Sequence, residues 1–194
     1  MGRIARGLTG YEAYHLTTRG ANKRDIFKDD IDRRRFIARL GDIALRAPWS
    51  CLGYCLMSNH VHLIIRGDGP TIGRGMRDLL GGHSRWFNTR HERTGPLFGG
   101  RYHHVHIAST EQMLTALQYV ARNPVKAGLV NRAEAWRWSS YSALISGVIH
   151  PGTIDLDGLR QILAGPRTPI ATVAARLQAI VEGDSHPPVT VTGG

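Results

Sequence analysis

Ser50-Cys-Leu-Gly-Tyr-Cys-Leu-Met57 and His60-Val-His-Leu-Ile-Ile-Arg66 are two neighbouring β-rich runs. Only Ser58-Asn59 separates them, and a connection of two residues is typical of a β-hairpin. Successive side chains of a strand point to opposite faces, so His60 and His62 share one face of the second run. The stretch therefore predicts an antiparallel hairpin with a pair of histidines on one side.

A strand and a helix are expected before the hairpin. Residues 12–19 alternate in polarity and end at Gly20, which predicts a strand. The helix that follows begins after Asp29 or Asp30, either of which can serve as its N-cap, and Pro48 stops it. Its predicted apolar face consists of Ile31, Phe36, Ile37, Leu40 and Ile43.

A second helix and a fourth strand are expected after the hairpin. Apolar residues at helical spacing predict a helix over 71–91. Its inward residues are Met76, Leu79, Leu80, Trp86 and Phe87. A Gly- and Pro-containing loop at 94–100 then leads to a strand over 102–107. The order βαββαβ predicts an α+β, ferredoxin-like antiparallel sheet with two helices on one face and the other face free for a substrate.

A third helix is expected over 110–122, as an addition to the βαββαβ unit. Ser109 and Gln112 have the spacing of a capping box at its start. Asn123-Pro124 is expected to end it, because the residue before a proline avoids the helical conformation. The apolar arc of this helix consists of Met113, Leu114, Ala116, Leu117, Val120 and Ala121.

The remainder of the chain is broken by Gly and Pro residues. We expect a short helix near 155–163, an Ala-rich amphipathic helix near 169–182 and a frayed tail from Gly183. The expected division is a main domain over 1–145 and a helical extension over 146–194. The apolar stripe of the last helix must be buried on the domain or on another subunit.

The charge of the chain points to a polyanionic partner. The formal net charge of the 194 residues is +10. Residues 1–145 contain 22 basic and 11 acidic residues, and residues 146–194 contain 3 and 4, so the excess lies in the first part. Nearly all the basic residues are arginine, which binds phosphate in bidentate fashion and stacks on bases. Nucleic-acid binding is therefore expected.

Composition also bounds the location of the protein. No apolar run approaches the roughly 20 residues that cross a bilayer, and the first residues lack the apolar stretch of a signal peptide. Two cysteines cannot form a disulfide framework. We expect a soluble protein of the cytoplasm with no membrane partner.

Histidine is the notable reactive residue type, and the pattern His-x-His occurs twice. The pairs are His60 with His62 and His104 with His106. Residues two apart on a strand lie about 6–7 Å apart on one face, close enough for two imidazoles to bind one ion. The pattern alone does not decide between a metal site and ordinary strand polarity, and it does not say which pair binds.

A structural zinc site built on the cysteines is the competing hypothesis. Cys51 and Cys55 lie four residues apart in the first run of the hairpin, which places them about 13 Å apart on a strand. Two sulfurs on one zinc ion must lie within about 4 Å of each other. The zinc hypothesis therefore fails, and both cysteines are expected to be core residues.

Tyr119 is the candidate nucleophile on the third helix. It lies about 150° from the centre of the apolar arc, so it is not expected to be a core tyrosine. Asn123 stands one turn beyond it on the same side. A tyrosine, an amide oxygen and a His-x-His pair could together form a metal-assisted phosphoryl-transfer site. The alternative is an amphipathic tyrosine on the surface.

A series of motifs, in order from about residue 11 to 145, resembles the single-tyrosine HUH transposases and, among them, the REP-associated tyrosine transposases. They are Tyr14-His-Leu-Thr-Thr-Arg-Gly20, Asp25-Ile-Phe27, Cys55-Leu-Met-Ser-Asn-His-Val-His-Leu-Ile-Ile65, Trp86-Phe-Asn-Thr-Arg-His91, Gly95-Pro-Leu-Phe-Gly-Gly-Arg-Tyr102, Tyr119-Val-Ala-Arg-Asn-Pro-Val-Lys-Ala-Gly-Leu-Val130 and Trp138-Ser-Ser-Tyr141. Ser58 stands where the family usually has proline in the turn before the histidines.

The resemblance implies a role for each residue of the site. His60 and His62 match the metal-binding pair, Tyr119 matches the nucleophile, and Asn123 matches the polar residue that is the third ligand. The implied cofactor is a magnesium or manganese ion. The implied reaction cuts and rejoins single-stranded DNA through a 5′-phosphotyrosine intermediate. His104 and His106 match no ligand of the family and are expected to be strand surface or DNA-facing.

The implied partner is a single-stranded DNA that carries a short palindromic hairpin. The protein is accordingly expected to associate with the nucleoid. Arg19, Arg101 and Arg122 are candidate DNA contacts or solvated surface residues. The sequence is compatible with a monomer or a homodimer. Two other functions remain open: a binding module for single-stranded nucleic acid that does not cleave, and a metal-dependent hydrolase that uses water instead of Tyr119.

Overall fold

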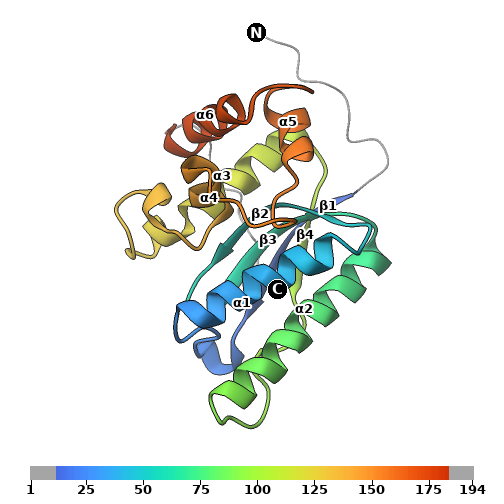
Figure 1. Ribbon diagram of the computed structural model, residues 1–194, viewed down its shortest axis with the longest axis vertical. Helices are drawn as coiled ribbons and strands as arrows, with labels where there is room; N and C mark the ends of the chain where they lie inside the picture. Colours follow the sequence, from blue (N-terminus) through green and yellow to red (C-terminus); the bar gives the residue numbers. More distant parts are fainter. Residues whose placement is uncertain (1–11, 184–194) are drawn as a thin grey trace.

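Four strands form one antiparallel sheet in the computed structural model, which describes residues 12–183 (Figure 1). The strands are β1 (Ala13–Arg19), β2 (Ser50–Leu56), β3 (His60–Arg66) and β4 (His103–Ile107). Their order across the sheet is β2-β3-β1-β4. This is the ferredoxin-like arrangement, so the predicted fold class is confirmed. The tail predicted from Gly183 lies, after its first residue, outside the described residues.

The register between the two central strands decides which side chains share a face. Leu16 of β1 pairs with Leu63 of β3, and Thr17 pairs with His62. Leu63 is therefore on one face with Leu16, whereas His62 is on the other face with Thr17. The predicted hairpin is present, with Met57 donating its N–H to the carbonyl of His60 at 2.9 Å.

Two helices cover the Leu63 face, as predicted. They are α1 (Asp30–Ala44) and α2 (Gly69–Arg90), which cross in front of the sheet in Figure 1. Asp29 caps α1 by accepting hydrogen bonds from the N–H groups of Ile31 and Asp32. Ile31 was expected in the core but is 50% exposed. At 100° per residue it lies on the side of α1 opposite the buried Phe36 and Leu40, so its assignment to the apolar face was wrong.

The other face of the sheet is not free, contrary to the expectation. It is covered in part by α3 (Thr110–Lys126), which contacts β2, β3 and β4. Leu117 of α3 lies over Gly53 of β2, where an added Cβ would meet its side chain at 3.3 Å. Because Gly53 has no side chain, α3 can lie close to the hairpin.

The predicted end of the third helix at residue 122 is wrong. Pro124 lies inside α3, which continues to Lys126. A proline this near the C-terminus costs only one hydrogen bond, the one to the carbonyl of Val120. The helix stops where Gly128 adopts a φ of 69°, and Leu129 donates its N–H to the carbonyl of Pro124 at 2.9 Å.

The C-terminal part adds three helices, α4 (Ser140–Ser146), α5 (Leu156–Leu163) and α6 (Ile170–Glu182), and α4 was not expected. Of these, α6 contacts α3, while α4 and α5 contact α6 and β2 (Figure 1). Short 3₁₀ turns occur at Ala21–Lys23 (η1) and Ala133–Ala135 (η2). Within residues 12–183, no helix combines the length and the apolar character needed to cross a membrane.

The last helix is buried on α3 of the same chain. Its residues Val173, Leu177 and Val181 are all less than 5% exposed. Gln118 of α3 donates through Nε2 to the carbonyls of Ile180, at 2.7 Å, and Gly183, at 3.0 Å. The extension and the sheet therefore share one hydrophobic core, and the boundary near residue 145 stays a prediction.

Candidate active site

Both histidines of the first pair project from β3 toward α3. Their ring centroids lie 4.9 Å apart, with the planes at 85°. His62 is 4% exposed, whereas His60 lies nearer the end of the strand and is half-buried. Arg19 of β1 pairs with His60 in the register. The strand geometry thus brings two imidazoles together at the point where α3 crosses the sheet.

The Nδ1 atom of His62 is held by two side chains of β1. It lies 3.0 Å from Nε2 of His15 and 3.2 Å from Oγ1 of Thr17. Nε2 of His62 is buried and has no hydrogen-bond partner in the described chain. Both partners can accept a proton, and when Nδ1 of His62 donates to one of them, the lone pair of the ring is on Nε2.

His60 has a comparable arrangement at the end of the hairpin turn. Its Nδ1 lies 2.7 Å from Oδ1 of Asn59, an oxygen that can only accept. The proton of His60 is therefore on Nδ1, and its lone pair is on Nε2. Asn59 in turn donates through Nδ2 to the carbonyl of Lys23 at 3.0 Å, which fixes the amide. The amide of Asn59 thus sets the tautomer of His60.

Burial keeps these imidazoles neutral. It lowers the pKa of His62 well below the ordinary range, and the charges of His15 and His60 lower it further. The pKa of His60 is lowered by burial and by the charge of Arg19. For both residues, the nearby side-chain amide of Asn123 raises the pKa and so opposes the shift. Burial lowers the pKa of His15 to about 4. Neutral imidazoles are the form that binds metal ions.

The helix α3 contributes Tyr119 and Asn123 to the same place. The ring of Tyr119 lies 5.6 Å from that of His62 and 5.7 Å from that of His15, nearly perpendicular to the first. Asn123 donates through Nδ2 to the carbonyl of Tyr119 at 3.3 Å, so its Oδ1 takes no part in this bond. Lys126 places its Nζ 4.7 Å from the centroid of the Tyr119 ring. Tyr119 is thus half-buried against the sheet.

The donors present here fit a divalent cation. The unpartnered Nε2 of His62 is the kind of buried polar atom that needs a ligand. Across residues 12–183, no three His, Cys, Asp or Glu side chains converge as a metal site. A third protein ligand beside the two histidines would therefore be of another type, and Asn123 is the amide whose side chain lies near both.

Comparison with known proteins identifies the family. The profile described as "Transposase IS200 like" matches residues 11–123, which is more than half of the chain and includes all four residues of the site. The chain belongs to the IS200-like transposase family. It is therefore a DNA-processing transposase.

A solved structure shares the fold of this transposase. A structure described as the REP-associated tyrosine transposase bound to a REP hairpin is 17% identical in sequence, with a TM-score of 0.58. The match covers 79% of this chain and 90% of that one. A putative transposase from Deinococcus radiodurans is 20% identical over 62% of this chain and 95% of that one, with a TM-score of 0.43. A comparison with curated proteins finds no match.

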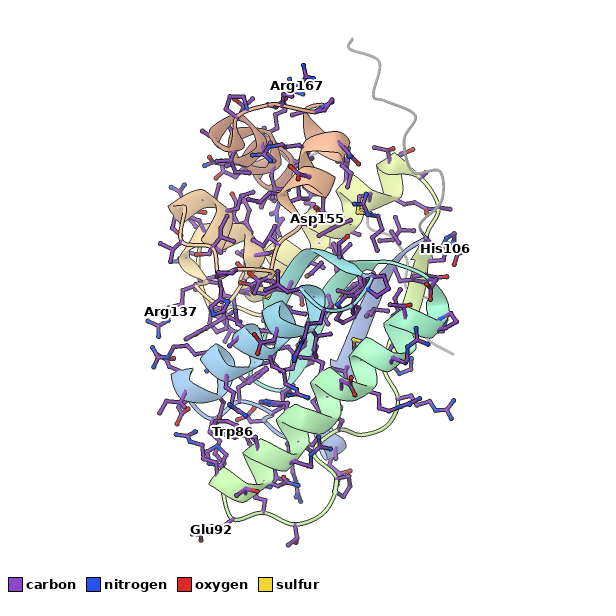
Figure 2. All side chains as sticks on the ribbon, turned by 45° about the vertical axis from the view of Figure 1, so that its right-hand side comes forward. Trp86, Glu92, His106, Arg137, Asp155 and Arg167 are labelled. Carbon is purple, nitrogen blue, oxygen red and sulfur yellow. The ribbon has the colours of Figure 1, made fainter. Side chains whose placement is uncertain are left out.

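The second histidine pair of the transposase lies on the other face of the sheet. His104 pairs with Leu16 and His106 with Tyr14, so both project to the side of α1 and α2. The ring of His106 lies 5.3 Å from that of Tyr14, at the edge of the molecule labelled in Figure 2. The sheet therefore separates the two pairs, and only His60 and His62 meet Tyr119.

The cysteines are buried and free, as expected. Cys55 is the cross-strand partner of His62, but its Sγ lies 3.7 Å from Sδ of Met57. Burial raises the pKa of the Cys55 thiol, and it raises that of Cys51 to about 12. Both thiols therefore stay protonated, which makes them poor metal ligands.

The three candidate DNA-binding arginines do not lie together. Arg19 is exposed beside His60, and Arg101 is exposed in the loop before β4. Arg122 is on the side of α3 that faces α6, where its Nη1 donates to the carbonyl of Val181 at 3.4 Å. Their contacts with DNA stay predictions.

Sequence reasoning missed His15 and Thr17. Both belong to a motif of the family resemblance, and both share a face of β1 with Arg19. The alternation of β1 was a usable signal, because it placed His15 and Thr17 on one face. What was missing was the register that sets this face beside His62.

Proposed function

We propose that this transposase cleaves and rejoins single-stranded DNA next to a hairpin, with Tyr119 as the nucleophile. The phenolic oxygen attacks the phosphorus of one phosphodiester, a bond forms between tyrosine and phosphorus, and the bond to the 3′ oxygen breaks. The phenol gives up its proton and the leaving 3′ oxygen takes one up, so the products are a 5′-phosphotyrosine and a free 3′-OH. Attack by another 3′-OH reverses the step and releases Tyr119, so the bond energy is kept.

The observation that carries the proposal is the meeting of Tyr119 with the two histidines of β3. A binding protein would need rings and positive charge, but it would not need a tyrosine whose ring centroid lies 5.6 Å from that of a buried imidazole with an unpartnered Nε2. The positive charge of Lys126 beside the Tyr119 ring is suited to a phosphate that approaches the phenol.

The proposed ligands of the cation are His60, His62 and Asn123. A magnesium or manganese ion held by these residues would supply positive charge to the oxygens of the scissile phosphate. The chain prepares the ligands by itself: Asn59 orients His60, and His15 and Thr17 orient His62.

The test is the formation of a covalent adduct. The full chain is incubated with a labelled single-stranded DNA that contains a hairpin and flanks, with magnesium or manganese. We expect a denaturation-resistant complex, and mass spectrometry should place the nucleotide on Tyr119. Binding without an adduct would favour the non-cleaving module, and cleavage without an adduct would favour a hydrolase that uses water.

A further inference from the structure

A groove of about 880 Å³ runs along α1, apart from the candidate active site. Its wall includes Tyr54 of β2, which pairs with Leu63 and so lies on the face opposite His62. The segment between α4 and α5 forms the far side. Figure 2 shows two of its lining residues, Arg137 and Trp86, on the same side of the molecule.

Arginine supplies the charge of this groove. Arg34, Arg35 and Arg137 line it, and no Asp or Glu does so within the described chain. Arg137 pairs with Asp30 on the rim, whereas Arg34 and Arg35 form no ion pair among residues 12–183. Two exposed guanidinium groups on one turn of α1 are thus left for a negatively charged ligand.

The groove also exposes apolar surface that the fold does not use. Ile31 is 50% exposed and Val148 is 77% exposed, on opposite walls. The ring of Trp86 contacts the guanidinium groups of Arg35 and Arg90, which lie 5.1 Å and 5.4 Å from its centroid. Apolar and aromatic surface next to arginines suits a ligand that has flat apolar faces and phosphates together.

We propose that this groove binds a single-stranded segment of the DNA that flanks the hairpin. Phosphates contact Arg34 and Arg35, and bases lie on Ile31 and Val148. A duplex stem fits less well, because its bases are stacked inside and would leave the apolar walls uncovered. The inference rests on the proposed function for the identity of the substrate, but the groove is separate from Tyr119.

The test measures binding apart from cleavage. Fluorescence anisotropy of the full chain compares a hairpin with a single-stranded flank and the same hairpin with blunt ends. Arg34→Gln with Arg35→Gln should weaken binding of the flanked hairpin about tenfold at 0.15 M salt and lower the salt slope by about 1.4, the value for two single-strand phosphate contacts. Binding of the blunt hairpin should not change.

The matched control is Arg46→Gln with Arg85→Gln, which removes the same amount of positive charge. Arg46 follows the end of α1 and Arg85 is on α2; both are exposed and lie outside the groove. Ile31→Ser tests the apolar wall and should weaken the flanked hairpin without a change of salt slope. Equal losses in the control, or a loss that is the same for the blunt hairpin, would overturn the proposal.

Competition identifies the source of the ligand. Unlabelled single-stranded DNA should displace the flank from the native chain, and duplex DNA or an acidic peptide should not. Displacement by the peptide at equal charge would show a protein-binding groove instead. None of these binding measurements depends on cleavage. The groove proposal can therefore be supported or overturned even if the chain forms no adduct at Tyr119.

Discussion

Nε2 of His15 lies 3.0 Å from Nδ1 of His62, and the two imidazole rings stack with their planes at 22°. Burial lowers the pKa of His15 to about 4, so this ring is neutral at physiological pH. Its Nε2 can then accept the proton of His62 Nδ1, which leaves the lone pair of His62 on the buried Nε2. His15 is therefore a positioning residue behind a proposed ligand.

Replacement of His15 should weaken metal binding. We expect His15→Leu to reduce the affinity for manganese about 10- to 100-fold, the usual effect of losing a group that orients a metal-bound histidine. Calorimetry or the manganese spin-resonance signal measures this without DNA. His106→Leu is the control on the other face of the sheet. Unchanged affinity in His15→Leu would mean that Thr17 alone holds His62.

Tyr119→Phe should abolish strand cleavage and adduct formation but keep hairpin binding nearly intact. The ring still packs against His62 and Lys126, so the free energy of unfolding should change by less than about 1 kcal/mol. Gel assays of cleavage and thermal melts check both parts. Cutting by the Phe variant would assign the nucleophile to another residue or to water.

The two histidine pairs form an internal control. His60→Ala or His62→Ala should remove metal-dependent cleavage, because each loses a proposed ligand. His104→Ala with His106→Ala should retain it, since the sheet separates this pair from Tyr119. Cleavage rates and metal titrations compare the three. If the second pair were essential and the first dispensable, the proposed site would be in the wrong place.

Acid should weaken the contact between the two helices of the Leu63 face. Hydrogen bonding to Arg90 lowers the pKa of Asp29 from 3.8 to about 2, and Asp29 also caps α1. A folded-state pKa below the unfolded one adds stability that is present above about pH 4 and is lost as the pH falls toward 2.

Asp29→Asn separates the charge of Asp29 from its capping role. The amide oxygen can still cap α1, but it does not titrate. We expect the fall in the urea midpoint between pH 5 and pH 3 to be smaller in Asp29→Asn than in the native chain. An identical fall in both would assign the acid sensitivity to other carboxylates.

Loss of α6 should lower stability more than it lowers chemistry. Truncation after residue 164 exposes the side of α3 that Val173, Leu177 and Val181 cover, and it removes both acceptors of Gln118. We expect a lower melting temperature and poorer solubility, with cleavage retained where the fragment is folded. A soluble, folded 1–164 fragment that binds but does not cut the hairpin would show that the extension completes the site.

Local sequence patterns predicted much of the fold. The alternation of β1 and β3, the cap at Asp29, the Ser109 capping box and the two-residue turn each act over a few residues, so the sequence shows them directly. Local rules predicted the structure least well where two of them conflict. Pro124 disfavours a helix, but the backbone hydrogen bonds before and after it keep α3 helical.

The sequence by itself determined that His60 and His62 share a face, because strand periodicity is a local property. Only the tertiary structure decided that this pair, and not His104 with His106, meets Tyr119. The reason is the register of β1, which places His15 and Thr17 beside His62 across 47 and 45 positions of chain and turns His104 to the other face. Pairing between distant strands depends on the packing of the whole sheet, which no short stretch of sequence contains.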